Sequence, residues 1–413
     1  MVRWRLGCVV IVYLLLLDGA PLVRAQAACE TASAGEIQNV LARCAGQHVL
    51  LAPGRYTVGP LFIASGTSFE LAAGATLVAT DDPAAYVRPD GGLYALLNAA
   101  DASTITLSGS GTIDGNGASW WARTRAAQRA AETPPPRPRL VAFDRCQHVE
   151  VSGLTLQDSP SFHLVFRSCT DVLVDGVTIH APADSPNTDG IDPMSSHNVR
   201  ITNATIDDGD DNVAIKSGLD DPAYPDAGSS DIAITNCTFL HGHGVSIGSE
   251  TNGGVQNVLV AQSTFQTTQN GARIKTNRDL GGHIDNVVYT DLQMRGVQQP
   301  IVLASYYPSI PPADAERPQA VGATTPQVSD VTLSNITATA AQRAGWIVGL
   351  PEAPLQAIRL DDVSIAADTG LQVRNAAVAL SRTRIDVQQG RDLLLEGSGL
   401  VLRSSAPVQV PSD

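Results

Sequence analysis

Four short polar clusters in the middle of the chain bring together residue types that can do acid–base chemistry. In sequence order they are Asn187-Thr188-Asp189-Gly190, Gly209-Asp210-Asp211-Asn212, Gly242-His243-Gly244 and Arg273-Ile274-Lys275. They supply three carboxylates, one imidazole and two cations. Carboxylates that crowd together cannot all ionise easily, so at least one pKa should rise and leave a protonated acid beside an ionised base. Cleavage of a glycosidic bond requires such a pair.

The histidine and the two cations extend this chemistry to an acidic sugar. His243 can hold or shuttle a proton and so set the protonation state of a neighbouring carboxyl group. Arg273 can bind a uronate carboxylate with two hydrogen bonds, and Lys275 adds a point charge. Each cluster alone is common in turns or on solvated strands. The prediction therefore depends on all four clusters lying in one groove.

A nine-residue pattern that recurs along the chain predicts how the clusters are positioned. Positions two and four are apolar, position six usually carries a turn-forming residue, and positions seven and nine are mostly apolar. This alternation predicts two short strands joined by a bend. Starts that recur every 23 to 44 residues predict a solenoid. The pattern begins at His148, Asp171, Asn198, Asp231, Asn257, Asn286, Asp330 and Ala357.

These repeats, and the scarcity of helical patterns, predict an all-β fold: a right-handed parallel β-helix whose neighbouring coils stack about 4.8 Å apart. Asp189, Asp211 and His243 each directly precede the residue that opens a second strand, so we expect them to stack on three consecutive coils. Asp210 lies one residue earlier, in a bend that can aim its carboxyl group outward. Arg273 and Lys275 are two apart on a strand and should point to the same side.

A short helix should cap the N-terminal end of the solenoid. Ser33 and Glu36 have the spacing of a capping box. Ile37, Val40 and Leu41 give the following residues one apolar helical face. We therefore expect a helix over the first coil.

Three long excursions interrupt the repeat, at residues 117–139, 220–230 and 306–327. They are rich in Pro, Ala and Asp, and long loops on a solenoid commonly wall a binding cleft. The repeat itself continues nearly to the end of the chain. We therefore expect a single catalytic domain over residues 26–413.

Residues 1–25 have the features of a secretory signal. Arg3 and Arg5 form a basic start, residues 6–17 are apolar, and residues 23–25 offer a small-residue cleavage site. An uncleaved membrane anchor is the alternative. We expect a secreted protein, extracellular or periplasmic, with no membrane contact after cleavage.

Five cysteines follow this signal. Cys29 and Cys44 bracket the expected capping helix and could form a disulfide in an oxidising compartment. The spacing of Cys146, Cys169 and Cys237 fits no metal template, and we expect them to be buried thiols. Cys146 and Cys169 both lie two residues before a repeat and should be stacked neighbours.

The formal net charge of −14 restricts the partners of the protein. Binding to nucleic acid needs clustered Lys and Arg, so we expect no nucleic-acid partner. An acidic protein also repels a polyanionic glycan on average, so an acidic polysaccharide must be held by locally placed cations. We expect a monomer.

The four clusters resemble the NTD, DD, GHG and RIK motifs of the polygalacturonases of glycoside hydrolase family 28, in the same order. The resemblance covers about residues 28–307. It implies the same β-helix fold, the α-1,4-linked galacturonan of pectin as substrate, and inverting hydrolysis with neither a metal nor a cofactor. Further similar segments are Gly54-Arg55-Tyr56, Tyr86, Gly111-Thr112-Ile113-Asp114-Gly115, Trp120-Trp121 and Ser159-Pro160.

The resemblance implies roles for the catalytic groups. Asp210 would be the general acid that protonates the leaving oxygen. Asp189 and Asp211 would activate the water on the opposite face, and His243 would tune Asp210. One departure is Asn212, where many relatives have Cys; this residue opens a strand and should be peripheral to the mechanism.

The resemblance also implies the residues that bind substrate. Arg273 and Lys275 would bind the galacturonate carboxylate, and Asn187 would support the site. Tyr307 matches an aromatic residue that relatives place at a subsite, with Tyr306 as the second choice.

Three other functions are compatible with a β-helix. A pectate lyase would need Ca²⁺ held by carboxylates and a basic group, and the Gly-His-Gly cluster has no place in that chemistry. A hydrolase of a branched pectin, rhamnogalacturonan or xylogalacturonan, is the second, although relatives that act on rhamnogalacturonan tend to lack the histidine cluster. A non-catalytic β-helix, such as an adhesin, would have no reason to keep the acid–base set.

Overall fold

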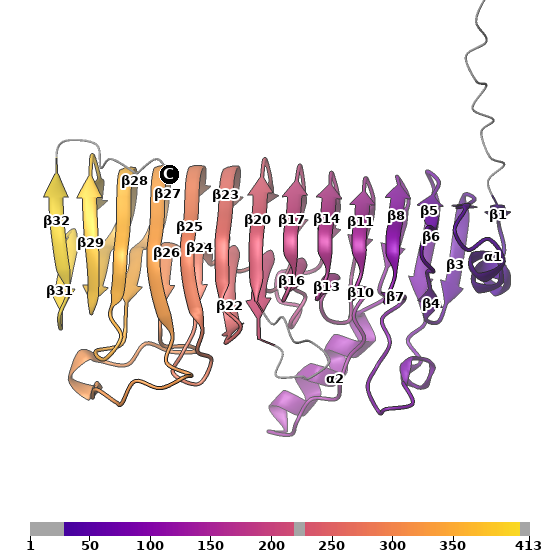
Figure 1. Cartoon of the computed structure of the whole chain (residues 1–413), viewed down its shortest axis with the longest axis horizontal. Coiled ribbons are helices and arrows are strands. Elements are labelled where there is room, and N and C mark those ends of the chain that lie inside the picture. Colours follow the sequence, from indigo (N-terminus) through magenta and orange to yellow (C-terminus); the bar gives the residue numbers. More distant parts are fainter. Residues whose placement is uncertain (1–28, 219–227, 405–413) are drawn as a thin grey trace, which may run out of the picture.

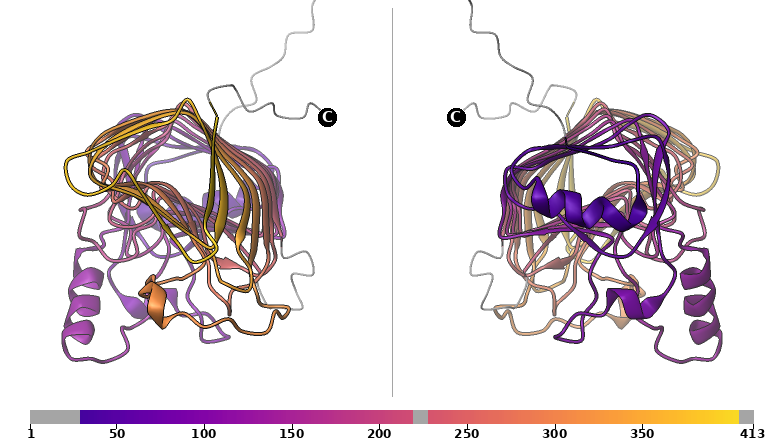
Figure 2. Two further views of the ribbon diagram at one scale, coloured as in Figure 1. Left: turned by 90° about the vertical axis from the view of Figure 1, so that its left-hand side faces the viewer. Right: turned by 90° about the vertical axis from the view of Figure 1, so that its right-hand side faces the viewer.

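The computed structural model describes residues 29–218 and 228–404, and these residues form one long solenoid of strands (Figure 1). The named strands pair in parallel from coil to coil. Figure 2 looks along the axis, where successive coils superimpose around a common interior. The predicted all-β fold, a right-handed parallel β-helix, is confirmed.

The strands stack in three parallel ladders, and a complete coil contributes one strand to each ladder. The first ladder, which carries the four clusters, contains β4 (Leu61–Phe62), β7 (Leu97–Ala100), β10 (Val141–Asp144), β13 (Leu164–Arg167), β16 (Ile191–Met194), β19 (Val213–Ser217), β22 (Val245–Thr251), β24 (Asn270–Lys275), β26 (Gln299–Ala304) and β31 (Leu393–Glu396). The second contains β1 (Cys29–Thr31), β2 (His48–Leu51), β5 (Ser68–Leu71), β8 (Ser103–Gly109), β11 (Gln147–Ser152), β14 (Thr170–Asp175), β17 (His197–Thr202), β20 (Ser229–Thr235), β29 (Ala376–Ser381) and β32 (Leu400–Ser404). The third contains β3 (Gly54–Val58), β6 (Ala75–Ala79), β9 (Thr112–Asp114), β12 (Thr155–Gln157), β15 (Thr178–His180), β18 (Thr205–Asp207), β21 (Thr238–Phe239) and β30 (Arg384–Val387). Longer strands of the C-terminal half bend from one ladder into the next: β23 (Val255–Gln266), β25 (His283–Arg295), β27 (Gln327–Val348) and β28 (Leu355–Arg374).

Alternate side chains of these strands point inward and stack in apolar columns. Phe143 and Phe166 lie on successive coils with ring centroids 5.3 Å apart. Phe239 and Phe265 also lie on successive coils, and their ring centroids are 4.7 Å apart. All four rings are buried. Because each coil buries its apolar residues only against its neighbours, the core runs the length of the solenoid.

The bends of the repeat require left-handed backbone conformations. Position six has a φ of 56° at Asn203 and at Asn236, and position one has a φ of 51° at Asn198. Asparagine tolerates this region better than most residues. The Asn236 side-chain amide also donates to Asn203 Oδ1 at 2.5 Å, so equivalent asparagines bond from coil to coil.

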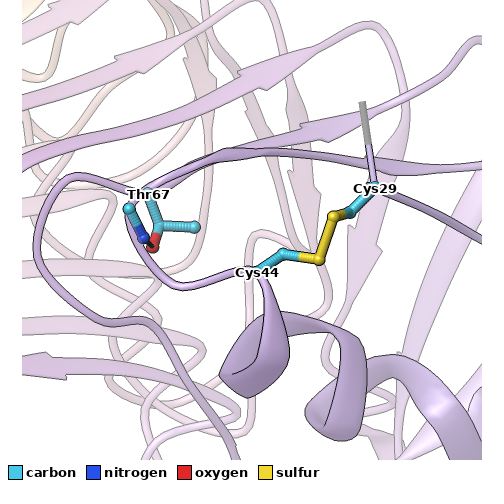
Figure 3. Close-up of a disulfide and its surroundings, with 4 residues drawn as sticks. Cys29, Cys44 and Thr67 are labelled. Carbon is cyan, nitrogen blue, oxygen red and sulfur yellow. Dashed lines mark hydrogen bonds between the residues drawn. A yellow bond between two sulfur atoms is a disulfide. The ribbon is translucent and has the colours of Figure 1, made fainter. Parts of the chain in front are cut away.

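A helix caps the first coil, as predicted. In α1 (Ile37–Arg43) the side chains of Ile37, Val40 and Leu41 are buried. The predicted capping box is wrong, because Ser33 makes no side-chain cap hydrogen bond and a 3-10 turn, η1 (Ala34–Glu36), intervenes. Cys29 and Cys44 form the disulfide that the sequence left open, and it ties the helix end to β1 (Figure 3). The Thr67 hydroxyl labelled in the same view accepts a hydrogen bond from the Gly46 amide at 3.0 Å, just after the helix.

One predicted loop is a helix instead. Most of excursion 117–139 forms α2 (Ala118–Arg129), because its run of Ala and Arg has high helix propensity. Trp120 and Trp121 are buried, and Trp121 Nε1 donates to Ser159 O at 3.0 Å, which fixes the helix to the solenoid. Most of excursion 220–230 lies outside the described residues. Excursion 306–327 is irregular apart from the short turn η3 (Ala313–Ala315).

The helix α2 and residues 306–326 project from the same side of the solenoid in both views (Figures 1 and 2). A further short turn, η2 (Pro83–Tyr86), lies in the segment before β7. Within the described ranges, no helix is both long and apolar enough to span a membrane. The predicted signal at residues 1–25 lies outside those ranges.

Candidate active site

The strand register stacks the three predicted residues of the site. Ile191 pairs with Val213 and Val213 with Val245, so the residues two before them, Asp189, Asp211 and His243, occupy equivalent positions on consecutive coils. The amide of Gly190 donates to Asp211 O at 2.9 Å, in agreement with this register. The column predicted from the repeat therefore exists in the backbone.

Asp211 is the centre of the cluster and is fully buried. Its Oδ1 atom accepts hydrogen bonds from Ser246 Oγ at 2.7 Å and from Arg273 Nη1 at 3.2 Å. Its Oδ2 atom pairs closely with Lys275 Nζ. Arg273 and Lys275 point to the same side of β24, as predicted, while Ile274 lies in the core. These two cations thus neutralise a carboxylate of the protein.

Asp210 forms a second, more accessible pair with His243. The distance from His243 Nδ1 to Asp210 Oδ1 is 3.1 Å, and Asn187 Nδ2 lies 3.5 Å from Asp210 Oδ2. Burial alone would raise the pKa of Asp210. The hydrogen bond and charge of His243, with the charge of Lys275, nevertheless hold the pKa of this carboxyl group below its ordinary value. These contacts favour the ionised form of Asp210.

Asp189 belongs to a buried network that the four clusters do not show. Lys216 Nζ lies 3.4 Å from Asp189 Oδ2 and 3.3 Å from Asp192 Oδ1. Burial, with the charge of Asp192, raises the pKa of Asp189 well above its ordinary value. Burial also raises the pKa of Asp192 to about 6, although Lys216 opposes that rise. Two members of this network, Asp192 and Lys216, were not among the predicted site residues.

The Asn212 side chain, predicted to be peripheral to the mechanism, lies in the hydrogen-bond network behind His243. It is fully buried, and its Nδ2 atom donates to Asp208 Oδ1 at 3.0 Å and to His241 O at 2.6 Å. Its Oδ1 atom accepts a hydrogen bond from the Gly244 amide at 2.9 Å. Asn212 thus holds the turn that carries His243.

Asp208 and the neighbouring glycines pack tightly behind this turn. A Cβ atom on Gly242 would meet Asp208 Oδ1 at 2.3 Å, and one on Gly190 would meet Asp208 Oδ2 at 2.9 Å. Burial, with the charges of Asp189 and Asp210, raises the pKa of Asp208 well above its ordinary value. The predicted rise in a carboxyl pKa therefore falls on Asp189, Asp192 and Asp208, and not on Asp210.

The buried His163 supports the same column from the preceding coil. Its backbone amide donates to Asp189 O at 2.8 Å, and its Nδ1 atom lies 3.1 Å from the same oxygen. Burial lowers the pKa of His163 to about 4, so the ring is neutral near neutral pH. His163 was not among the predicted site residues, and the nearest motif noted in the sequence was Ser159-Pro160.

A cavity of about 280 Å³ adjoins the cluster on its C-terminal side. Arg273, Lys275 and Tyr307 line it, and Lys275 Nζ lies 5.3 Å from the centre of the Tyr307 ring. Tyr306 also lines this cavity, but its ring lies against Arg278 and Arg374 instead. The structure thus brings the predicted Tyr307 to the predicted cations.

The site also contains a possible metal-binding group. Among the described residues, Asp210, Asp211 and His243 offer ligand atoms within 4.8 Å of one another. The donor set does not suit Ca²⁺, which takes roughly six to eight oxygen ligands. Moreover, Asp211 already faces Arg273 and Lys275, whose positive charges disfavour a cation at its oxygens.

Paired carboxylates, a histidine and cations thus lie together on one ladder of a parallel β-helix, the arrangement expected of a glycosidase. Comparison with known proteins agrees with this description. The sequence profile described as "Glycosyl hydrolases family 28" matches residues 47–382. An endo-polygalacturonase of Pectobacterium carotovorum subsp. carotovorum is 33% identical over 83% of this chain and 86% of the relative. The chain therefore belongs to family 28 of the glycosyl hydrolases and is a glycosidase.

Solved structures agree on the fold. The polygalacturonase from Erwinia carotovora ssp. carotovora superposes with a TM-score of 0.70, at 27% identity, over 89% of this chain and 96% of that one. A hyperthermoactive exopolygalacturonase from Thermotoga maritima has a TM-score of 0.74 at 23% identity, over 86% and 87% of the two chains. The similar proteins thus include enzymes named for both endo and exo action.

Proposed function

We propose that the protein is a secreted polygalacturonase that hydrolyses α-1,4-galacturonosyl linkages of pectin with inversion. The observation that carries this proposal is the pair of Asp210 and His243, 3.1 Å apart, beside the cations Arg273 and Lys275 on neighbouring coils. The pair supplies acid–base chemistry, and the cations suit the carboxylate of a galacturonate unit. Family membership and the curated polygalacturonase relatives support the same substrate.

Asp210 acts as the general acid in this proposal. It is the more accessible of the paired aspartates and the one that His243 can supply with a proton. Its pKa is held below its ordinary value because His243 and Lys275 face it. A bound uronate engages Lys275 and adds a negative charge, and both effects raise the pKa of Asp210. Substrate binding thereby prepares the acid.

Asp189 and Asp211 activate the attacking water in this proposal. Asp211 is held by Arg273 and Lys275, and Asp189 by Lys216, so neither carboxylate can swing away. Inversion requires that water reach the sugar carbon from the face opposite the general acid. That assignment comes from the family resemblance of the four clusters.

The rival functions find less support. Lyase chemistry through Ca²⁺ is disfavoured by the cations at Asp211. A branched-pectin hydrolase remains related, since an endo-xylogalacturonan hydrolase from Aspergillus tubingensis shares the fold with a TM-score of 0.65 at 21% identity. An adhesin, PfbA of Streptococcus pneumoniae, has a TM-score of 0.52 at 15% identity, which again concerns the fold alone. Unlike a binding module, this chain carries the complete acid–base set.

The substitution Asp210→Asn tests the catalytic assignment. We expect kcat on polygalacturonate to fall by a factor of about 10² to 10⁴, because the general acid is lost while the fold is kept. Asp231→Asn is the matched control, since Asp231 occupies position one of the repeat, where Asn198, Asn257 and Asn286 occur naturally. Reducing ends released per unit time are the readout. Equal activity of the two variants would contradict the assignment.

We also propose that residues 26–413 form one catalytic domain, that residues 1–25 direct export to the periplasm or the cell exterior, and that the protein acts as a monomer. The described solenoid, continuous from β1 to β32, supports the single domain.

A further inference from the structure

A second cavity lies on the first ladder, nearer the N-terminus than the acids. Its volume is about 390 Å³, which is within the range of ligand pockets. It is lined by β7, β10 and β13 and by the segments that precede β7 and β10. None of its polar residues belongs to the four clusters. We call it the arginine pocket after the five arginines that line it, Arg88, Arg137, Arg139, Arg145 and Arg167.

The register places this pocket in line with the acids. Leu164 of β13 pairs with Ile191 of β16, which pairs with Val213 of β19, so β13 lies two coils before the strand that follows Asp210 and Asp211. At about 4.8 Å per coil, this separation is about 10 Å along the axis. A sugar chain that follows the ladder through the site therefore passes over the pocket.

The pocket is continuous with the candidate active site. Arg137 Nη2 donates to Asn187 Oδ1 at 2.7 Å, and Asn187 in turn lies beside Asp210. The Arg139 guanidinium lies 5.6 Å from the centre of the Phe162 ring, and Lys216 Nζ lies 4.3 Å from the same ring. Arg137 thus adjoins the residues around Asp210, and Arg139 adjoins the ring that lies against Lys216, the partner of Asp189.

Two of the five cations lack a carboxylate partner. Within the described residues, no Asp or Glu oxygen lies within ion-pairing distance of Arg137 or Arg139. Desolvation lowers the pKa of Arg139, the charge of Asp192 opposes that shift, and the charge of Arg167 adds to it. An anion in the pocket would stabilise the charged guanidinium further.

The other three arginines are ion-paired but leave the pocket positive. Asp144 is the one acidic residue among the described residues that line it. The chain has a net charge of −14, so the charge of this cavity, with five arginines around it, is opposite to that of the protein as a whole. The pairs are Arg88 with Asp90, Arg145 with Asp101 and Asp144, and Arg167 with Asp144.

We propose that the arginine pocket binds carboxylates of galacturonate units remote from the bond that is cleaved. This proposal rests on the proposed substrate. Arginine suits the planar carboxylate of a uronate, which it can bind with two parallel hydrogen bonds. Together with Arg273 and Lys275 on the far side of the acids, the pocket would grip the polymer on both sides of the cleavage position. Affinity should therefore grow with the length of the oligomer.

The test measures binding of oligogalacturonates by calorimetry in the Asp210→Asn background, so that no ligand is consumed. We expect Arg139→Gln to weaken binding of long oligomers by about tenfold, the loss expected for one hydrogen bond to a charged group, and to leave the dimer unchanged. Arg88→Gln should act in the same direction with little risk to the fold, because Arg88 is 39% exposed and pairs with the exposed Asp90.

Arg382→Gln is the matched control, since Arg382 is 40% exposed and is likewise paired with an aspartate, Asp361. We expect it to bind every oligomer as the background does. Methyl-esterified oligomers, which lack the charge, should gain no affinity from the pocket. If long acidic oligomers bind equally well to all these variants, the pocket proposal is wrong even where the parent protein hydrolyses polygalacturonate. If Arg139→Gln reduces binding of long oligomers but the parent protein hydrolyses nothing, the pocket stands and the proposed activity fails.

Discussion

At the scale of single residues, the site separates its carboxyl groups by their surroundings. Asp210 faces His243 and Lys275, which lower its pKa. Asp189 and Asp208 are buried among other acids, and their pKa values rise. Groups with pKa values moved apart are the usual basis for dividing acid and base roles. Here the proposed acid is the group with the low pKa, so the charge of the substrate must take part in preparing it.

This reversal predicts how the reaction depends on pH. A general acid must be protonated, so the rate falls as the pH rises through its pKa. The profile of kcat/KM reports the free enzyme, where the pKa of Asp210 is low, whereas kcat reports the complex, where the uronate raises it. We expect the alkaline limb of kcat to lie at higher pH than that of kcat/KM. Coincident limbs would contradict this account, and a methyl-esterified substrate should reduce the separation.

The sequence could predict only part of this site. The four clusters and their register predicted the stacked column, because strand alternation fixes which residues of a coil are equivalent. Asp192 and Lys216 were missed as partners, because their ion pair depends on how side chains from β16 and β19 fill the space between two coils. The hydrogen bonds of Asn212 were missed for the same reason, since they connect to a turn about 30 residues later.

At the scale of elements, the turn between β21 and β22 positions the histidine. Asn212 is its anchor, through bonds to the carbonyl of His241 and the amide of Gly244. The amide of His243 itself donates to Asp210 O at 2.6 Å, which completes the hold on the turn. The alignment of His243 with Asp210 therefore depends on the conformation of this turn.

The substitution Asn212→Ala tests that role. It leaves buried polar groups on Asp208 and Gly244 without partners, so we expect the free energy of unfolding to fall by about 3 kcal/mol. In the protein that remains folded, kcat should fall more than KM changes, because Arg273 and Lys275 are untouched. Chemical denaturation and steady-state kinetics measure the two effects. An unchanged kcat in the folded variant would show that Asn212 is only structural.

The two helices differ in how far the sequence predicts them. The capping helix α1 was predicted from three apolar residues that share one helical face, and the structure buries all three. The helix α2 was missed because it is an insertion outside the repeat. Its buried Trp120 and Trp121 are adjacent in sequence and give no helical period, and only contact with the solenoid explains their burial.

At the scale of the whole molecule, an acidic chain presents two cationic cavities on one ladder. The cavity at Arg273 and Lys275 lies on the C-terminal side of the acids, and the arginine pocket lies on the N-terminal side. The solenoid makes this arrangement possible, because every coil contributes an equivalent strand to the same face. The repeat predicted the face, but the arginines come from loops and strand ends whose register the pattern does not describe.

The products released from polygalacturonate by the intact protein test the central claim most directly. In the presence of a chelator, we predict new reducing ends in proportion to bonds cleaved, with no ultraviolet absorbance from unsaturated uronides. Hydrolysis adds water across the bond and needs no metal in the proposed mechanism, whereas elimination leaves a double bond in the product. Unsaturated products, or activity that chelation abolishes and Ca²⁺ restores, would contradict the assignment of this protein as a polygalacturonan hydrolase.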